Sequence, residues 1–235
     1  MYAHQSLHSP LRFNTQTDIK SATGIFEHLS CFLPALLALG ADSLELPARE
    51  KDLHMWAARG LGCTCWVSYS DQASGLGPDQ MKMVEGEKWM ESVRAWEEGG
   101  SVGGVPPGVE EVFGGKGNDY TNAQSIYLLR PEVSTSFSFL PHFFPWVLVF
   151  LGFCAEYRVK FLCLQTVESF YLLWKTTGDS VWRDRGWAVF EAIERQSRTA
   201  YGYASISGVE GVPAHQNDDM PRYVVSTRAF RTCND

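Results

Sequence analysis

Residues 126–132 read IYLLRPE and residues 166–174 read TVESFYLLW, and an apolar run separates these two segments. The first segment ends on the carboxylate of Glu132. The second has the apolar spacing of a helix, and we expect Phe170 and Leu173 on its buried side. Within the run, residues 133–155 contain no Asp, Glu, Lys or Arg. The elements on either side of this run therefore decide the fold.

The composition is that of a folded protein, with 45% hydrophobic and 13% aromatic residues in a chain of 235. A net charge of -7 and the lack of a basic stripe argue against nucleic acid as a partner. Cys63 and Cys65 are one residue apart, but no second pair follows at zinc-ligand spacing, so we expect no zinc site. The first residues lack the basic and apolar segments of a signal peptide. We interpret the chain as cytosolic or as starting within a longer protein.

The first half of the chain predicts a pair of helices. The apolar positions from 26 to 39 are nearly continuous, Pro34 marks the start or a kink, and Gly40 is the expected end. Pro47 then begins a second helix, which we expect to reach about Ser68. Two helices joined by a short loop form a helical hairpin. A short amphipathic stretch follows at 85–98, and residues 99–117 are rich in Gly and Pro, as in a surface loop.

A second helical hairpin is expected after the apolar run. Residues 166–177 form its first helix, Gly178 ends that helix, and Asp179 is the N-cap of a longer helix to about Arg198. Residues 201–206 predict either a hairpin strand or an extended loop. The sequence therefore predicts a mainly α fold with long loops, and residues 1–22 as a poorly structured N-terminus.

The apolar run at 133–155 has two interpretations from its residues alone. It is long enough to cross a bilayer, and Arg158 and Lys160 would then lie on the cytosolic side. Pro141, His142 and Pro145 fall in its first half and favour a buried hairpin or helix instead. Both alternatives stay open.

Four motifs together carry a resemblance to a known family. Without the run, the chain reads LRPE followed by TVES, which resembles a signature of glycoside hydrolase family 47, the class I α-1,2-mannosidases. The segments HLSCF (28–32) and LALGAD (37–42), TCWVSY (64–69) and GLGPD (75–79) also resemble motifs of that family. The resemblance extends over residues 24–132 and 166–224. It implies that residues 23–235 are part of an (α/α)7 barrel, an incomplete barrel of helical hairpins.

The resemblance also implies roles for single residues. Hydrolysis of a glycosidic bond uses two carboxyl groups, and the resemblance assigns catalytic roles to Glu132 and Asp79. Without it, Glu132 would be an ordinary carboxylate near a helix N-terminus and Asp79 a turn residue. The family pattern has Glu where this chain has Asp79, so the carboxylate reaches less far. The substrate-binding residues implied by the resemblance are Arg130, Glu168 and His28.

A disulfide and a metal are implied in the same way. The family pattern pairs the cysteines that match Cys31 and Cys65, with Cys63 as a nearby competing thiol. Trp66 stands where the family has His, and Ala35 where it has Gly. Family members are Ca²⁺-dependent inverting enzymes that trim high-mannose N-glycans in the endoplasmic reticulum or Golgi. The calcium-binding Thr motif and the leaving-group acid of the family have no match here, so we expect no metal ligand within this chain and an inactive fragment.

The resemblance gives the apolar run a third interpretation. Family members pass directly from RPE to TVES, whereas here residues 133–165 intervene. Val133 has codons that begin with GU and Gln165 has a codon that ends with AG, which are the boundary signals of an intron. We therefore interpret 133–165 as the product of a retained intron. The functional alternatives are a non-catalytic glycan-binding protein and a membrane-anchored interaction protein, anchored by 133–155 or by a missing N-terminal segment.

Overall fold

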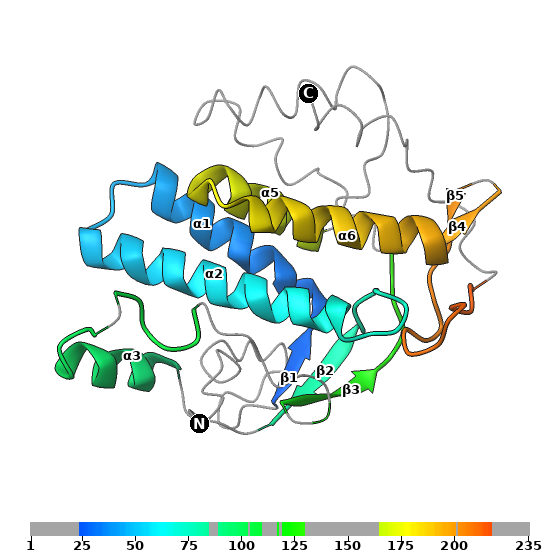
Figure 1. The fold of residues 1–235 in the computed structure, drawn as a ribbon, viewed down its shortest axis with the longest axis horizontal. Helices are drawn as coiled ribbons and strands as arrows, with labels where there is room; N and C mark the ends of the chain where they lie inside the picture. The colour runs from blue at the N-terminus through cyan, green and yellow to red at the C-terminus, as the bar shows by residue number, and fades with distance from the viewer. Residues whose placement is uncertain are drawn as a thin grey trace, which may run out of the picture.

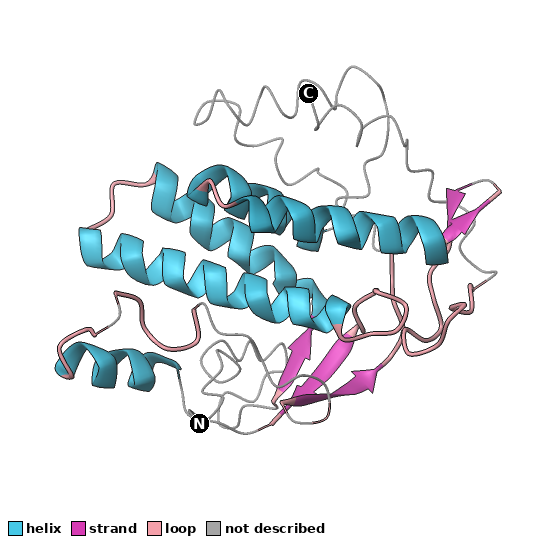
Figure 2. Ribbon diagram, in the orientation of Figure 1, coloured by secondary structure: helices cyan, strands magenta, loops and turns pink. Residues whose placement is uncertain are grey.

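The computed structural model describes residues 24–84, 89–102, 104–109, 117, 119–129, 165–200 and 202–217. These residues form a mainly helical structure with a few short strands (Figures 1 and 2). Predictions about residues 1–22, Arg130, Glu132 and the run 133–164 lie outside the described residues. None of the described helices is long and apolar enough to cross a membrane.

The first hairpin forms from the near-continuous apolar segment. A 3-10 helix η1 (His28–Phe32) leads into α1 (Leu33–Ser43), which has Pro34 in its first turn. The expected end at Gly40 is wrong, because α1 continues to Ser43 and the Leu44 amide donates to the Gly40 carbonyl at 3.0 Å. Burial of Ala41 beyond the glycine outweighs the cost of about 1 kcal/mol of a glycine within a helix.

Helix α2 (Ala48–Ser70) returns along α1, with Pro47 at its N-cap position. Small residues line the part of α2 that faces its neighbours. A Cβ at Gly62 would lie 2.6 Å from Leu173 Cδ1 and 2.8 Å from Trp182 Cζ3. The missing side chain at Gly62 therefore lets the second hairpin pack closely on the first.

The second hairpin consists of α5 (Gln165–Thr177) and α6 (Ser180–Gln196). As expected, Gly178 ends α5 in a left-handed conformation with φ of 72°, and its amide donates to the Trp174 carbonyl. Asp179 is the N-cap, and its Oδ1 accepts from the Val181 amide at 3.0 Å. Phe170 and Leu173 are fully buried, which confirms the predicted inner face of α5.

Helix α3 (Trp89–Glu98) confirms the amphipathic stretch. Trp89 is buried, and the Trp96 ring packs edge-on against Trp56 of α2 at 5.6 Å between ring centroids.

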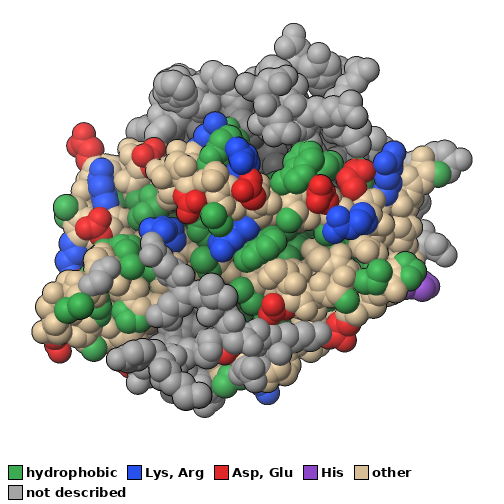
Figure 3. Space-filling model, viewed as in Figure 1, with side chains coloured by type: hydrophobic (Ala, Val, Ile, Leu, Met, Phe, Trp, Pro, Cys, Tyr) green, Lys and Arg blue, Asp and Glu red, His purple; other side chains and the backbone are tan. Residues whose placement is uncertain are grey.

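The surface carries charges of both signs. Lys and Arg side chains are interspersed with Asp and Glu side chains over the face shown in Figure 3.

A small antiparallel sheet was not predicted. It consists of β1 (Ile25–Glu27), β2 (Gln80–Met83) and β3 (Tyr120–Gln124). The strands pair in the order β1-β2-β3 and lie below the helices in Figure 1. Strands this short carry too few alternating positions to be recognised in the sequence. A second pair, β4 (Arg198–Thr199) and β5 (Gly202–Tyr203), confirms a hairpin near 201–206.

The two helical hairpins agree with the expected building units of the fold. Helices α1, α2 and α5 pack together around one core, and α6 packs on α5. Among the described residues these hairpins do not close into a ring. The (α/α)7 barrel itself thus stays an expectation, while the mainly helical class is observed.

Candidate active site

Three segments distant in the sequence meet where the sheet adjoins helix η1. The His28 amide donates to the Asp79 carbonyl at 2.9 Å, and the Asp79 amide donates to the Ile126 carbonyl at 2.8 Å. The backbone of Asp79 therefore bridges the HLSCF segment and the segment that leads to Arg130 and Glu132. The Asp79 residue is only 7% exposed. Two of the expected site residues, His28 and Asp79, are thus direct neighbours.

The imidazole of His28 contacts two hydroxyl groups. Its Nε2 lies 2.5 Å from the Tyr69 hydroxyl and 3.4 Å from Thr166 Oγ1. The two hydroxyl oxygens lie 3.3 Å apart. Tyr69 comes from the last turn of α2 and Thr166 from the first turn of α5. The TVES segment thus reaches His28 through its threonine.

The tyrosines around His28 are deeply buried. The rings of Tyr69 and Tyr127 lie 5.6 Å and 5.8 Å from the imidazole, centroid to centroid, and both residues are 1% exposed. Burial raises the pKa of Tyr69 to about 12, although its hydrogen bond with Thr166 acts in the opposite direction. Burial also raises the pKa of Tyr127 well above its usual value. Both phenols therefore keep their protons at neutral pH.

The GLGPD loop packs against Tyr69. A Cβ at Gly77 would lie 2.9 Å from Cε2 of Tyr69, and Gly75 has a φ of 74°, which favours glycine. The two glycines let the loop lie against the tyrosine ring and place Asp79 directly before β2. The loop motif and the tyrosine that contacts His28 therefore form one packed unit.

Glu168 differs from its neighbours on α5. Thr166 and Ser169 are fully buried, whereas Glu168 is exposed in the first turn of the helix. Arg130 and Glu132 lie outside the described residues, and Leu129, just before them, is buried. The structure therefore brings together His28, Asp79 and Thr166 and places Glu168 on the outer side of the same helix.

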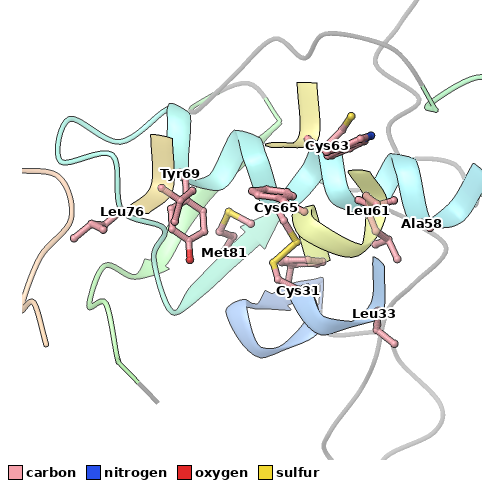
Figure 4. Packing of buried hydrophobic residues seen from close by; sticks show 14 of the residues in the cluster. Cys31, Leu33, Ala58, Leu61, Cys63, Cys65, Tyr69, Leu76 and Met81 are labelled. Carbon is pink, nitrogen blue, oxygen red and sulfur yellow. A yellow bond between two sulfur atoms is a disulfide. The ribbon is translucent and has the colours of Figure 1, made fainter. Parts of the chain in front are cut away.

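Cys31 and Cys65 form the disulfide that the resemblance implied, with a Cα–Cα distance of 5.9 Å. Cys63 leaves α2 away from this bond (Figure 4), and its Sγ accepts from Arg185 Nη1 at 3.4 Å. Positions 63 and 65 of a helix face different sides, so Cys63 does not compete for Cys31. Trp66, the departure from the family pattern, packs against Phe170 at 6.5 Å between ring centroids.

Sequence reasoning missed Tyr69 and Thr166 as neighbours of His28. Both belong to motifs that were recognised, TCWVSY and TVES, but the first was interpreted for its cysteine and the second for its glutamate. The spacing of 41 residues from His28 to Tyr69 carries no signal of contact. A packed tertiary structure is needed to find it.

Comparisons with known proteins identify the family of the chain. The sequence model of the family described as glycosyl hydrolase family 47 matches residues 2–228. The chain belongs to this family. Mannosyl-oligosaccharide 1,2-alpha-mannosidase MNS3 of Arabidopsis thaliana is 29% identical over 213 residues, which cover 84% of the chain and 26% of the relative. Human mannosyl-oligosaccharide 1,2-alpha-mannosidase IC is 25% identical, covering 86% of the chain and 22% of the relative.

The family 47 chain also has a fold similar to a solved structure. It superposes on the alpha-1,2-mannosidase from Trichoderma reesei with a TM-score of 0.53 and 22% identity, over 85% of this chain and 31% of that one. The chain therefore spans about a quarter of the length of the curated relatives that it matches and about a third of this solved structure.

Proposed function

We propose that the chain is part of an α-1,2-mannosidase that removes terminal α-1,2-linked mannose from high-mannose N-glycans. The observation that carries the proposal is the junction of His28 and Asp79, which come from two motifs of the family and share a backbone hydrogen bond of 2.9 Å. The family match over residues 2–228 supports it. The relatives named above bear α-1,2-mannosidase names.

In this proposal, Asp79 and Glu132 are the catalytic carboxylates and the reaction inverts the anomeric configuration. A carboxylate activates a water molecule, which attacks the anomeric carbon on the face opposite the leaving group. Arg130, His28 and Glu168 bind the hydroxyls of the sugar. Asp79 is one methylene shorter than the family glutamate, about 1.5 Å, so the placement of the water is the most sensitive step.

The proposed α-1,2-mannosidase activity depends on calcium in the family. The described residues contain no group of three or more His, Cys, Asp or Glu that could hold a metal ion. None of the described residues is therefore assigned as a calcium ligand.

We expect no turnover by the 235-residue chain alone, because it matches only about a quarter of its relatives. The test is a mannose-release assay on a high-mannose N-glycan with added Ca²⁺. Clear release by this chain would contradict the expected inactivity. A chimaera, in which residues 24–132 joined directly to residues 166–217 replace the matching part of a full-length relative, tests the activity itself. We expect mannose release by the chimaera, loss of release with Asp79→Asn, and retention with Asp119→Asn.

Asp119 is a matched control for Asp79. Both residues are 7% exposed, and they lie near opposite ends of β2, because Val84 donates to the Asp119 carbonyl while Asp79 directly precedes the strand. Equal loss in both variants would indicate a folding defect rather than a catalytic role for Asp79.

A second candidate function is glycan binding without hydrolysis, and the aspartate at position 79 favours it. In that case the chimaera binds high-mannose glycan on an array and releases no mannose. Asp79→Glu, which restores the family side chain, would then restore release if the shorter reach is the cause.

Localisation and the apolar run belong to the proposal as well. We place the protein in the secretory pathway, the compartment of N-glycan trimming, and carbonate extraction tests membrane anchoring through 133–155.

We further propose that residues 133–165 derive from a retained intron. Sequencing of the full transcript should then show messages without these codons. The presence of these codons in every message would contradict the retained intron.

A further inference from the structure

We propose that Ser205 is a positioning residue of the active site, because its hydroxyl holds the chain just before Arg130 and Glu132. The inference rests on the proposed function, in which Glu132 is a catalytic carboxylate and Arg130 binds the sugar. It concerns the segment 125–129, which directly precedes Arg130 in the sequence. Ser205 belongs to none of the four family motifs described above.

Segment 125–129 is bonded along one edge to the chain at Ile206. The Tyr127 amide donates to the Ile206 carbonyl at 2.8 Å, and the Ile206 amide donates back to the Tyr127 carbonyl at 2.9 Å. A third bond runs from the Val209 amide to the Ser125 carbonyl at 2.8 Å. Tyr127 and Ile206 are both buried, which excludes water that would otherwise compete for these groups.

The opposite edge of the segment is bonded to Asp79. The Ile126 carbonyl accepts from the Asp79 amide at 2.8 Å. Its two neighbours, Ser125 and Tyr127, bond on the side of Ile206 instead. Successive residues therefore alternate between the two edges, as they do in a β-strand with a partner on each side. The segment is thus held between Asp79, a carboxylate of the proposed reaction, and Ile206.

Ser205 continues this pattern to the end of the segment. Its Oγ accepts from the Leu129 amide at 3.4 Å, so a side chain takes the place of a backbone carbonyl. Both residues are buried, Ser205 at 1% exposure and Leu129 at 2%. A buried amide without an acceptor is unfavourable. The Ser205 hydroxyl therefore stabilises the position of Leu129, one residue before Arg130.

Ser205 is itself fixed on its other side. Its carbonyl accepts from the Asn217 amide at 2.9 Å, and the amide of the preceding Ala204 donates to the Ser197 carbonyl at 2.7 Å. Ser197 is the C-cap of α6. The Ser205 hydroxyl is therefore anchored to the end of a long helix before any ligand arrives.

The consequence for the proposed reaction is a fixed position of the Glu132 carboxylate. A glycosidase needs its two carboxyl groups at a set separation, and an inverting enzyme leaves room between them for the attacking water. Small displacements of a catalytic group lower the rate strongly. Ser205 and Asp79 hold the chain that precedes Glu132 from opposite edges. We therefore expect loss of the Ser205 hydroxyl to act on the reaction through Glu132.

The first test is hydrogen exchange of backbone amides in the full 235-residue chain, followed by NMR. We expect Ser205→Ala to speed exchange of the Leu129 amide about 3- to 10-fold, as for the loss of one hydrogen bond. The Tyr127 amide, which donates to Ile206, should stay within about 2-fold of its rate in the wild type, because the opening is local. Equal acceleration at both amides, or unchanged exchange at Leu129, would overturn the inference.

Ser207→Ala is the matched control. Ser207 lies two residues from Ser205, but it is exposed and its hydroxyl donates to the His215 carbonyl at 3.1 Å. We expect the Leu129 amide to exchange in this variant as it does in the wild type. Acceleration as large as in Ser205→Ala would contradict a specific role of the Ser205 hydroxyl.

The second test is mannose release by the chimaera described above, at a temperature where circular dichroism shows each variant to be folded. We expect Ser205→Ala to lower kcat about 3- to 10-fold and to change KM by less than about 2-fold, since His28 and Glu168 still bind the sugar. Ser207→Ala should retain both constants. An unchanged kcat in Ser205→Ala would overturn the inference and leave the proposed function intact.

Failure of the proposed function would appear in the chimaera that retains Ser205. If that chimaera releases no mannose, the proposed hydrolysis falls, and the role of Ser205 in the reaction falls with it. Faster exchange of the Leu129 amide in Ser205→Ala would then show a structural role alone.

Discussion

Ser169 of α5 donates a hydrogen bond of 2.5 Å to the carbonyl of Cys31, which lies 138 positions earlier in the chain. The same Oγ accepts a hydrogen bond of 3.3 Å from the Ala35 amide. One side chain from the TVES segment thus joins both the 3-10 helix and α1. These bonds hold α5 against the first hairpin, although the apolar run lies between the two segments in the sequence.

Replacement of Ser169 by Ala should destabilise the fold by about 1–3 kcal/mol, because the carbonyl of Cys31 and the amide of Ala35 would both lose a partner in a buried place. Urea denaturation followed by circular dichroism measures this. Ser70→Ala is the control, since Ser70 is exposed at the end of α2 and should change stability by less than about 0.5 kcal/mol. Equal stability of the two variants would contradict the role of Ser169.

Loss of the Cys31–Cys65 disulfide should lower the free energy of unfolding by about 3–4 kcal/mol in the chain-entropy model, for a loop of 34 residues. The double variant Cys31→Ala/Cys65→Ala is compared with Cys63→Ala by thermal denaturation. Cys63 is buried but free, so its removal should have an effect of about 1 kcal/mol or less. A larger effect of Cys63→Ala than of the double variant would show that the pairing is wrong.

Two glycines in helices should respond to Ala in opposite directions. At Gly62 the new Cβ would be 2.6 Å from Leu173 Cδ1, so we expect destabilisation by about 1–3 kcal/mol through overpacking. At Gly40 the nearest atom, Leu44 Cδ1, is 3.8 Å away. Gly40→Ala should therefore stabilise α1 by about 0.5–1 kcal/mol. Melting temperatures measured side by side decide this, and a stabilised Gly62→Ala would refute the close packing of the two hairpins.

Stability should fall in strong base in a way that depends on Tyr69. Its pKa is raised from 10.0 to about 12 in the folded state by burial, so the folded protein keeps the proton that the unfolded chain releases. The contribution of the buried Tyr69 phenol to the free energy of unfolding is fully present below pH 10. It is lost between pH 10 and about 12, at up to ~1.4 kcal/mol per pH unit. The stability difference between the wild type and Tyr69→Phe should therefore shrink from pH 9 to pH 11. A difference that does not vary with pH would contradict the burial of this phenol.

The sequence predicted the helical hairpins well because their signals are local. Gly178 and Asp179 stand next to each other as stop and start, and Pro47 marks the start of α2 from its N-cap. The end of α1 was misplaced at Gly40, because burial of Ala41 sustains the helix past a residue that is locally unfavourable. Local preference is a weak guide where tertiary packing decides.

The sheet and the contacts of His28 with Tyr69 and Thr166 could not be predicted for a related reason. Strand β2 has four residues, and its partners begin 55 positions before and 40 positions after its own first residue. The contact between Tyr69 and His28 is also long-range and depends on how α2 and α5 pack. His28 and Asp79 could be named from motifs, but their direct hydrogen bond appears only in the folded chain.

The most direct test of the account is a titration of the 235-residue chain with methyl α-1,2-mannobioside, observed by saturation-transfer NMR, in three forms: wild type, His28→Gln and Asp119→Asn. We predict binding by the wild type and by Asp119→Asn, and binding about 3- to 10-fold weaker by His28→Gln, the loss expected for one hydrogen bond to a sugar hydroxyl. Equal binding by all three forms, or no binding by the wild type, would contradict a mannose site built around His28 and Asp79.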